Sequence, residues 1–264
     1  MIIDGRAIAE DIYTELSAFF KERPSKLGIV VVGENPVIAS FVRIKERAAA
    51  RLGVEMLRID LSETASTGDV IDAVRRLAQG CDAVIVQLPL PKKVDSNAVL
   101  SDIPPQKDVD ALCPRHSGEH IVDAPVALAV MEILKRAGVD PRGRRTVVIG
   151  AGPLVGKPSA ELLKRAGANV SLFTLEEGSI EDLKEADIIV SGAGKTGLIK
   201  PEHIKRGVAL IDAGTSELNK RVVGDADPAC ADIASVFTPV PGGVGPVAVA
   251  MIFRNLKALV EYQG

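Results

Sequence analysis

Three polar side chains in the first half of the chain have the types and positions needed for proton transfer. Lys45 lies four residues after Phe41 in a helix-periodic segment, so the two share one helix face. Gln87 follows a β-branched apolar run, and Asp110 lies in a proline-containing loop. A buried lysine beside a hydrogen-bonding amide can have its pKa lowered toward neutrality, which makes it a usable acid or base. The alternative is a solvated helix-surface lysine with an exposed loop acid.

A second stretch, TVVIGAGPLVGKPSAELL (146–163), has the order strand, tight turn, helix. Its glycines would let the backbone approach a pyrophosphate, and the helix N-terminus would present unpaired N–H groups to phosphate. The spacing is GxGxxxG rather than GxGxxG, so a glycine-rich turn that binds nothing stays an alternative. Apolar segments at 168–173, 186–192 and 208–214, separated by helix-length polar segments, predict a parallel nucleotide-binding sheet.

The loop TPVPGGVGP (238–246) is the third candidate. Its prolines and glycines fix a backbone shape at an entropic cost, which indicates a loop moulded around a flat ligand or the nicotinamide end of a cofactor. A structural hairpin or a cis-proline turn is the alternative.

The elements that must position these candidates alternate between helix and strand. Apolar spacing predicts helices over 5–20, 37–52, 69–79, 95–101, 125–137 and 247–262 and strands over 26–33, 54–61 and 82–90. We therefore predict an α/β protein of two domains. The first is an N-terminal α/β substrate domain (1–122 and 247–264) on which the C-terminal helix packs back. The second is a Rossmann-like parallel-sheet nucleotide domain (123–246).

Composition narrows the possible partners. The formal net charge of −3 gives no global electrostatic reason to bind nucleic acid or an anionic membrane, so we expect neither partner. The three cysteines are widely spaced, which favours a reducing compartment over disulfides or a zinc site, and we expect no metal. Acidic residues interrupt the first twelve positions, and no apolar run is long enough to span a membrane. We expect a cytoplasmic protein.

Five stretches together resemble one family, the methylenetetrahydrofolate dehydrogenase/cyclohydrolase (FolD) enzymes. They are VGENPVIASFVRIKERAAARLGV (32–54), VIVQLPLP (84–91), PQKDVD (105–110), LVGKP (154–158) and TPVPGGVGP (238–246). They occur in the family's order and cover nearly the whole chain. The resemblance implies a homodimer formed through the nucleotide domain and a role in one-carbon metabolism that supplies purine biosynthesis.

The resemblance also implies residue roles. Lys45 would be the catalytic lysine of the cyclohydrolase step, Gln87 its hydrogen-bonded partner, and Asp110 the carboxylate that holds the pterin ring. The folate substrate would be bound by Phe41, Lys45, Gln87, Pro89, Asp110, Pro241, Gly242 and Gly243. The cofactor would be bound by Gly150, Ala151, Gly152, Pro153, Val155, Gly156, Glu176 and Thr215.

Four departures from the family pattern concern these roles. Phe41 stands where the family usually has a folate-stacking tyrosine, and KDVDG ends in Ala111. Ala151 replaces the arginine expected to bind the 2′-phosphate of NADP. Glu176, near the end of the second nucleotide-domain strand, would favour a ribose 2′-hydroxyl and repel a 2′-phosphate, although a solvated glutamate is equally compatible. NADP is the family expectation, and NAD is a close alternative.

The resemblance implies that the chain oxidises 5,10-methylenetetrahydrofolate to the methenyl form with a nicotinamide cofactor and hydrolyses the product to 10-formyltetrahydrofolate. Hydride removal needs positioning more than an acid or base, whereas water addition needs proton transfer. Alternatives are a dehydrogenase without cyclohydrolase activity, a shikimate-dehydrogenase-like oxidoreductase, and a non-catalytic pterin or nucleotide sensor. A modified pterin such as tetrahydromethanopterin in place of folate also stays open.

Overall fold

The computed structural model describes residues 1–114, 121–174, 180–218 and 221–264. These divide into two compact units. The three-strand unit contains Asp11–Pro125 and Ile252–Gly264, and the five-strand unit contains Met1–Glu10 and Val126–Met251. The sequence placed residues 1–10 in the first domain, whereas their contacts group them with the five-strand unit.

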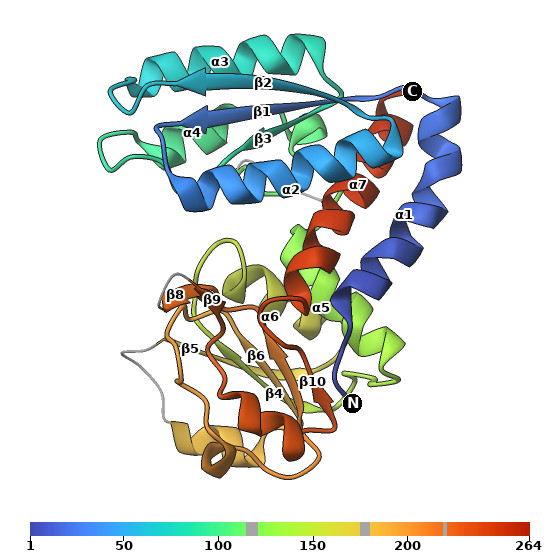
Figure 1. Cartoon of the computed structure of the whole chain (residues 1–264), viewed down its shortest axis with the longest axis vertical. Helices are drawn as coiled ribbons and strands as arrows, with labels where there is room; N and C mark the ends of the chain where they lie inside the picture. Colours follow the sequence, from blue (N-terminus) through green and yellow to red (C-terminus); the bar gives the residue numbers. More distant parts are fainter. Residues whose placement is uncertain (115–120, 175–179, 219–220) are drawn as a thin grey trace. The chain divides into compact units, whose positions relative to one another are not determined.

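The three-strand unit is built on a parallel sheet of order β2-β1-β3, formed by β1 (Lys26–Val32), β2 (Glu55–Leu61) and β3 (Ala83–Val86). Six of the seven β1 residues are buried, as expected for a central parallel strand covered on both faces. Helices α3 (Thr67–Gly80) and α2 (Pro36–Leu52) cover opposite faces (Figure 1). The short helix α4 (Ser96–Asp102) shares an apolar core with α3.

Two long helices complete this unit. Residues 11–22 of α1 (Gly5–Glu22) and 252–263 of α7 (Val244–Gln263) lie side by side (Figure 1). Arg254 and Glu15 form an ion pair of 3.1 Å between them. The buried amide of Asn255 donates to the carbonyl oxygens of Val109 (2.9 Å) and Asp123 (2.8 Å). The C-terminal part of α7 therefore packs on the unit that carries β1 to β3.

The five-strand unit has a wholly parallel sheet of order β10-β7-β6-β4-β5. Its strands are β4 (Arg145–Ile149), β5 (Asn169–Phe173), β6 (Ile188–Ser191), β7 (Ala209–Asp212) and β10 (Val236–Phe237). The chain runs from β4 through α6 (Gly156–Arg165) to β5 and then returns to the other side of β4. The strand order thus reverses between β4 and β6, and nucleotides bind at such a reversal, outside the carboxyl ends of the strands. Helix α5 (Pro125–Arg136) precedes this sheet.

The N-terminal residues extend this sheet. The backbone N–H of Ile3 donates to the carbonyl of Phe237, and the N–H of Phe237 donates to the carbonyl of Met1, each at 2.9 Å. Ile2 and Phe237 therefore form a parallel bridge beside β10. This pairing joins residues more than 230 positions apart, so no local sequence pattern predicts it.

Several short elements were not predicted. They are the hairpin of β8 (Ser216–Leu218) and β9 (Arg221–Val223) and the 3-10 helices η1 (Pro105–Lys107), η2 (Ile180–Glu185), η3 (Pro201–His203) and η4 (Pro228–Asp232). In the described parts of the connections from β5 to β6 and from β6 to β7, 3-10 turns stand where the sequence predicted helix-length segments. Elements of three to six residues are too short to show a hydrophobic period.

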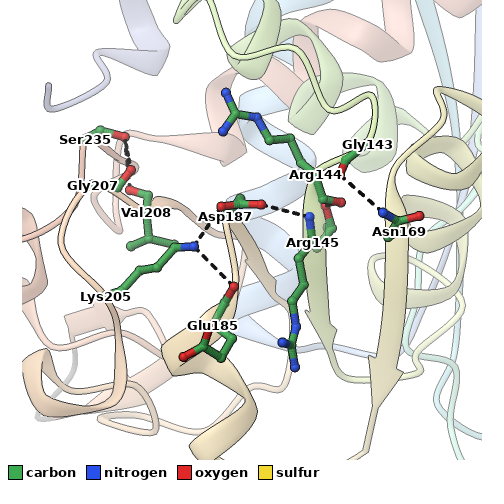
Figure 2. Close-up of polar contacts among 11 residues, drawn as sticks. Gly143, Arg144, Arg145, Asn169, Glu185, Asp187, Lys205, Gly207, Val208 and Ser235 are labelled. Atoms are coloured by element: carbon green, nitrogen blue, oxygen red, sulfur yellow. Dashed lines mark hydrogen bonds and ion pairs between the residues drawn. The ribbon is translucent and has the colours of Figure 1, made fainter.

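The amino ends of the five strands are tied together by polar contacts (Figure 2). Asp187 accepts from the backbone N–H of Arg145 (3.0 Å) and from the Lys205 ammonium (2.7 Å), and these contacts hold its pKa below the usual range. Lys205 also donates to the carbonyl of Glu185 at 3.2 Å. At the outer strand, the Ser235 hydroxyl donates to the carbonyl of Gly207 at 2.7 Å. The amino ends of the strands are therefore held together by hydrogen bonds and an ion pair.

Two further findings concern the whole chain. Among the helices the structure describes, none combines the length and the apolar character that a membrane crossing requires. The three cysteines, Cys81, Cys113 and Cys230, are all free and buried.

Candidate functional site

Helix α2 presents Phe41 and Lys45 on one face. The helix begins where the Asn35 side chain accepts from the N–H groups of Val37 (2.8 Å) and Ile38 (3.2 Å), with proline in the first turn. It ends at Gly53, whose φ of 72° is the left-handed conformation common at helix C-termini. Both ends of the helix are thus fixed by local contacts.

Lys45 reaches Gln87 at the carboxyl end of β3. The Lys45 ammonium nitrogen lies 2.9 Å from Gln87 Oε1, and Gln87 is only 8% exposed. Gln87 Nε2 donates to the carbonyl of Leu88 at 2.8 Å, which requires the amide oxygen to face the lysine. The structure therefore brings together two of the three residues that the sequence selected for proton transfer.

The third residue, Asp110, shares the electrostatic environment of Lys45. Burial lowers the pKa of Lys45, and the Asp110 carboxylate opposes that shift. Burial raises the pKa of Asp110 to about 6, Lys45 opposes the rise, and Asp108 adds to it. The cost of desolvating each charge is thus partly offset by the other. The solvated-lysine alternative does not fit this environment.

The loop that carries Asp110 is held on both sides. Asp108 is buried, its Oδ2 accepts from the N–H of Cys113 at 2.6 Å, and its backbone forms a parallel bridge to Val84 of β3. Ala111 has a φ of 55°, and it is the one non-glycine residue with positive φ in the described part of the chain. Glycine adopts this region without penalty, and alanine does not.

Phe41 lies on an exposed apolar stripe of α2. Val37, Phe41 and Ile44 are 45%, 39% and 43% exposed, and their spacings of four and three residues put them on one face of the helix. Pro89, which follows a cis peptide bond, is also exposed. Both predicted substrate contacts are therefore accessible to a ligand.

The predicted dinucleotide turn is close-packed where its glycines require it. A Cβ on Gly156 would overlap the carbonyl oxygen of Gly150, and a Cβ on Gly150 would overlap that of Gly192, which follows β6. The φ of Gly150 is 97°. At Gly152, by contrast, a Cβ would meet nothing within 4 Å. The backbone after β4 thus bends tightly onto the start of α6 and leaves its outer side open.

The arrangement of this turn fits a dinucleotide. Helix α6 begins at Gly156. The N–H groups of Lys157 and Ser159 donate to the carbonyl oxygens of Gly152 (3.2 Å) and Val155 (3.0 Å), and Pro158 has no N–H, so an anion would be met by the turn that precedes the helix. Gly152 and Pro153 are exposed, and Ala151 and Val155 are half-buried. Residues 150–156 therefore form a backbone cradle of the kind that holds a pyrophosphate.

The remaining predicted ligand contacts lie in loops of the five-strand unit or outside the described residues. Thr215 is exposed in the loop after β7, and Glu176 lies outside the described residues. Pro241, Gly242 and Gly243 belong to the five-strand unit, where the N–H of Gly5 donates to the carbonyl of Gly242 at 2.9 Å. The peptide bond before Pro241 is cis, and Gly242 has a φ of 108°. The cis-proline alternative for this loop is thus correct as a description of its backbone.

Sequence reasoning missed two buried carboxyl groups: Asp212, the last residue of β7, and Asp225, which follows β9. Asp225 accepts from backbone N–H groups of the loop after β6, and Asp212 accepts from those of Gly214, after β7, and of Ala226. An acidic residue at the end of an apolar strand, in VALIDAG, and another in VVGDADP were the available signals.

These features define a class: an α/β protein with a lysine–glutamine pair on one unit and a Rossmann-like nucleotide cradle on the other. Two family models match the chain. The catalytic domain of tetrahydrofolate dehydrogenase/cyclohydrolase matches residues 3–110, and its NAD(P)-binding domain matches residues 124–264. The chain belongs to the tetrahydrofolate dehydrogenase/cyclohydrolase family, as the resemblance indicated.

Individual relatives match this chain over its full length. The bifunctional protein FolD of Halothermothrix orenii is 36% identical over 100% of this chain and 99% of its own. The Trypanosoma brucei methylenetetrahydrofolate dehydrogenase-cyclohydrolase, solved with NADP cofactor and inhibitor, has a TM-score of 0.93 at 34% identity, covering 100% of this chain and 98% of its own. The FolD enzyme of Campylobacter jejuni has a TM-score of 0.94 at 31% identity, covering 100% and 99%.

We predict that Ala111→Gly stabilises the protein. Glycine removes the conformational free energy that an L side chain costs at positive φ. Glycine also gives the unfolded chain more conformational entropy, which opposes this gain but is the smaller effect. The free energy of unfolding should therefore rise by about 0.5–1 kcal/mol. Denaturant unfolding of the three-strand unit measures this. Ala137→Gly, at the end of α5, is the control and should give no stabilisation. An unchanged or lower stability of Ala111→Gly would show that the loop tolerates alanine without strain.

Proposed function

We propose that this protein oxidises 5,10-methylenetetrahydrofolate to 5,10-methenyltetrahydrofolate with a nicotinamide cofactor and then hydrolyses it to 10-formyltetrahydrofolate. The observation that carries the proposal is the 2.9 Å hydrogen bond from Lys45 to the buried Gln87, beside Asp110, in a catalytic domain of this family. The roles of the individual residues are part of the proposal.

For the hydrolysis, Lys45 is the proton-transfer group. Burial lowers the pKa of Lys45, so a larger fraction of the amine is neutral near neutral pH than for a solvated lysine. The neutral Nζ accepts a proton from the water that adds to the methenyl carbon, and the resulting ammonium returns it when the ring C–N bond opens. Gln87 Oε1 accepts a hydrogen from Nζ throughout and holds the amine in place. Asp110 accepts hydrogen bonds from the pterin ring.

For the oxidation, the protein positions the reactants and moves no proton. The hydride leaves a carbon flanked by two nitrogens, whose lone pairs spread the positive charge that remains, so no acid or base is required. A bound nicotinamide dinucleotide supplies the hydride acceptor. The cradle of residues 150–156 would hold its pyrophosphate, and Thr215 lies after β7 on the same edge of the sheet.

We propose NADP as the cofactor, with NAD as the second candidate. The NADP complex of the Trypanosoma brucei relative supports NADP. Ala151, in place of an arginine, favours NAD because it offers no positive charge to a 2′-phosphate. Initial rates with each cofactor at equal concentration decide between them.

Two further parts of the proposal concern assembly and location. We propose a homodimer formed through the five-strand unit, where Leu218 and Val222 of the β8–β9 hairpin are 51% and 43% exposed. Sedimentation of the purified chain tests it. We also propose the cytoplasm as its location, because three free, buried cysteines suit a reducing compartment.

Lys45→Ala should abolish hydrolysis and spare oxidation. We expect the cyclohydrolase kcat to fall by about 10²–10⁴-fold, the usual effect of removing a general acid or base, while hydride transfer continues. The decay of methenyltetrahydrofolate absorbance measures the first activity, and reduced cofactor measures the second. Lys21→Ala, at an exposed end of α1, is the control. Equal hydrolysis rates in wild type and Lys45→Ala would remove the role proposed for Lys45.

Asp110→Asn should move the pH dependence of hydrolysis. The Asp110 carboxylate raises the pKa of Lys45, so its removal lets burial lower that pKa further and the neutral amine forms at lower pH. The rising limb of cyclohydrolase kcat against pH should therefore shift to lower pH, while the KM for the pterin increases. Asp102→Asn, on α4 beside Arg75, is the control. A limb that stays in place or moves to higher pH would remove Asp110 from the surroundings of Lys45.

Ala151→Arg should favour NADP. A guanidinium at this position can pair with the 2′-phosphate, and a charge-assisted contact of this kind changes affinity by about 10–100-fold. We expect the KM for NADP to fall relative to that for NAD. Ala151→Gln, with a long uncharged side chain, is the matched control and should leave the ratio of the two KM values unchanged. If the arginine variant also leaves it unchanged, residue 151 does not face the adenosine ribose.

A further inference from the structure

Asp225 is a fully buried carboxylate that binds the loop after β6. It has 0% exposure, and three groups of one short segment donate to it. The Ser191 hydroxyl and the N–H of Ala193 donate to Oδ2, at 2.6 and 2.8 Å, and the N–H of Lys195 donates to Oδ1 at 2.7 Å. Asp225 itself lies between β9 and η4, 30 to 34 positions away from these three residues in the sequence. One side chain thus fixes the backbone of residues 191–195.

This segment touches the dinucleotide turn. Gly192 lies directly after β6, and a Cβ on it would overlap the Val155 side chain at the start of α6. On the other side, a Cβ on Gly150 would overlap the carbonyl oxygen of Gly192. Residues 150 and 192 follow β4 and β6, the two strands between which the strand order reverses. The loop held by Asp225 therefore forms one wall of the predicted nucleotide position.

A second carboxylate extends the same arrangement to the loop after β7. Asp212 accepts from the N–H groups of Gly214 (2.9 Å) and Ala226 (2.8 Å). The two carboxyl groups are interlocked with glycines, because a Cβ on Gly214 would overlap Asp225 and one on Gly224 would overlap Asp212. Thr215 follows Gly214 directly. The loops after β6 and β7 are thus fixed as one piece.

Stability alone is a poor explanation for this pair. Two buried carboxyl groups cost desolvation free energy, and burial with the nearby Asp225 charge raises the pKa of Asp212 to about 6. Apolar side chains would fill the same space at lower cost, so buried charges of this kind are weak evidence for stability. What the carboxylates do provide is a fixed conformation for two loops at the ligand-binding edge.

The strands β6 and β7 lie on the opposite side of β4 from β5. This position indicates which part of a dinucleotide the loops after β6 and β7 face. In a Rossmann-like unit the pyrophosphate lies at the first glycine turn, and the adenosine ribose lies by the end of the next strand, here β5. The nicotinamide half must then extend the other way, over β6 and β7. We propose that Asp225 is a positioning residue for the dehydrogenase reaction, which fixes residues 192–195 as the surface against which the nicotinamide half of the dinucleotide packs. This inference rests on the function proposed above.

The test compares Asp225→Asn with Asp227→Asn. Asparagine keeps the shape but presents an NH₂ group to a backbone N–H, so the loop loses at least one acceptor. Asp227 is a matched control, because it is two residues away and caps only η4, through the N–H of Ala229 at 2.9 Å. We expect the Kd for reduced cofactor, titrated by nicotinamide fluorescence, to rise about 10-fold in Asp225→Asn, and dehydrogenase kcat to fall by a similar factor. Cyclohydrolase kcat, measured without nucleotide, should stay within about twofold of wild type.

A merely structural role would give a different pattern. Loss of folded protein would lower both activities in proportion and leave the Kd of the remaining folded fraction unchanged, which would overturn the proposal. Ser191→Ala is a milder second variant that removes one of the three donors and keeps both N–H contacts. It should raise the cofactor Kd by about threefold, and an unchanged Kd would overturn the proposal even if Asp225→Asn fails to fold.

The same measurements separate this inference from the proposed function. Cofactor titration needs no folate substrate, so it reports on Asp225 whichever pterin is used. A wild-type protein that binds reduced cofactor but neither oxidises methylenetetrahydrofolate nor hydrolyses the methenyl form would refute the proposed function. A wild-type protein active in both assays, with Asp225→Asn equal to it in Kd and kcat, would refute only the inference.

Discussion

The hydrogen bond between Lys45 and Gln87 is the interaction on which the proposed chemistry of the three-strand unit depends. An ammonium group removed from water loses several kcal/mol of solvation, by order of magnitude, unless nearby groups replace it. Here an amide oxygen at 2.9 Å and the Asp110 carboxylate do so only in part, since the net effect on the lysine is a lowered pKa. The helix caps of α2 and the bridge between Asp108 and Val84 matter because they hold these groups in place. Lys45 and Asp110 also influence each other, so their titrations are properties of the pair.

In the five-strand unit, acidic residues have different partners at the amino ends and at the carboxyl ends of the strands. At the amino ends of the strands, Asp187 binds a lysine ammonium and closes the edge with a charge pair (Figure 2). At the carboxyl ends, Asp212 and Asp225 bind backbone N–H groups instead. Those contacts hold the loops after β6 and β7 through their backbone. A charge pair therefore closes the amino ends of the strands, and carboxylates that bind backbone N–H groups fix the loops at the carboxyl ends.

The sequence predicted the parts of the site that local pattern determines. Gln87 was found because prolines mark the end of its strand, and the 150–156 turn was found because its glycines lie between an apolar strand and a helix. Asp225 was missed because its partners are 30 to 34 residues away and no spacing rule links them. The pairing of Ile2 with Phe237 was missed for the same reason. At Ala111 the departure from the family pattern was visible in the sequence, but the positive φ that gives it an energetic meaning is a property of the folded loop.

The replacement of the family's tyrosine by Phe41 bears on whether both reactions can occur. A phenol would add one hydrogen bond near the lysine. Phe41 instead belongs to an apolar stripe with Val37 and Ile44, which can stack on a flat ring but cannot donate. Yet the lysine is already oriented without it, because Gln87 Oε1 accepts from Nζ and Leu88 fixes the glutamine amide. The groups to which we assign the proton transfer are therefore oriented independently of residue 41. The substitution should affect how tightly the pterin stacks more than whether the methenyl carbon can be hydrated, and this favours the bifunctional enzyme over a dehydrogenase alone.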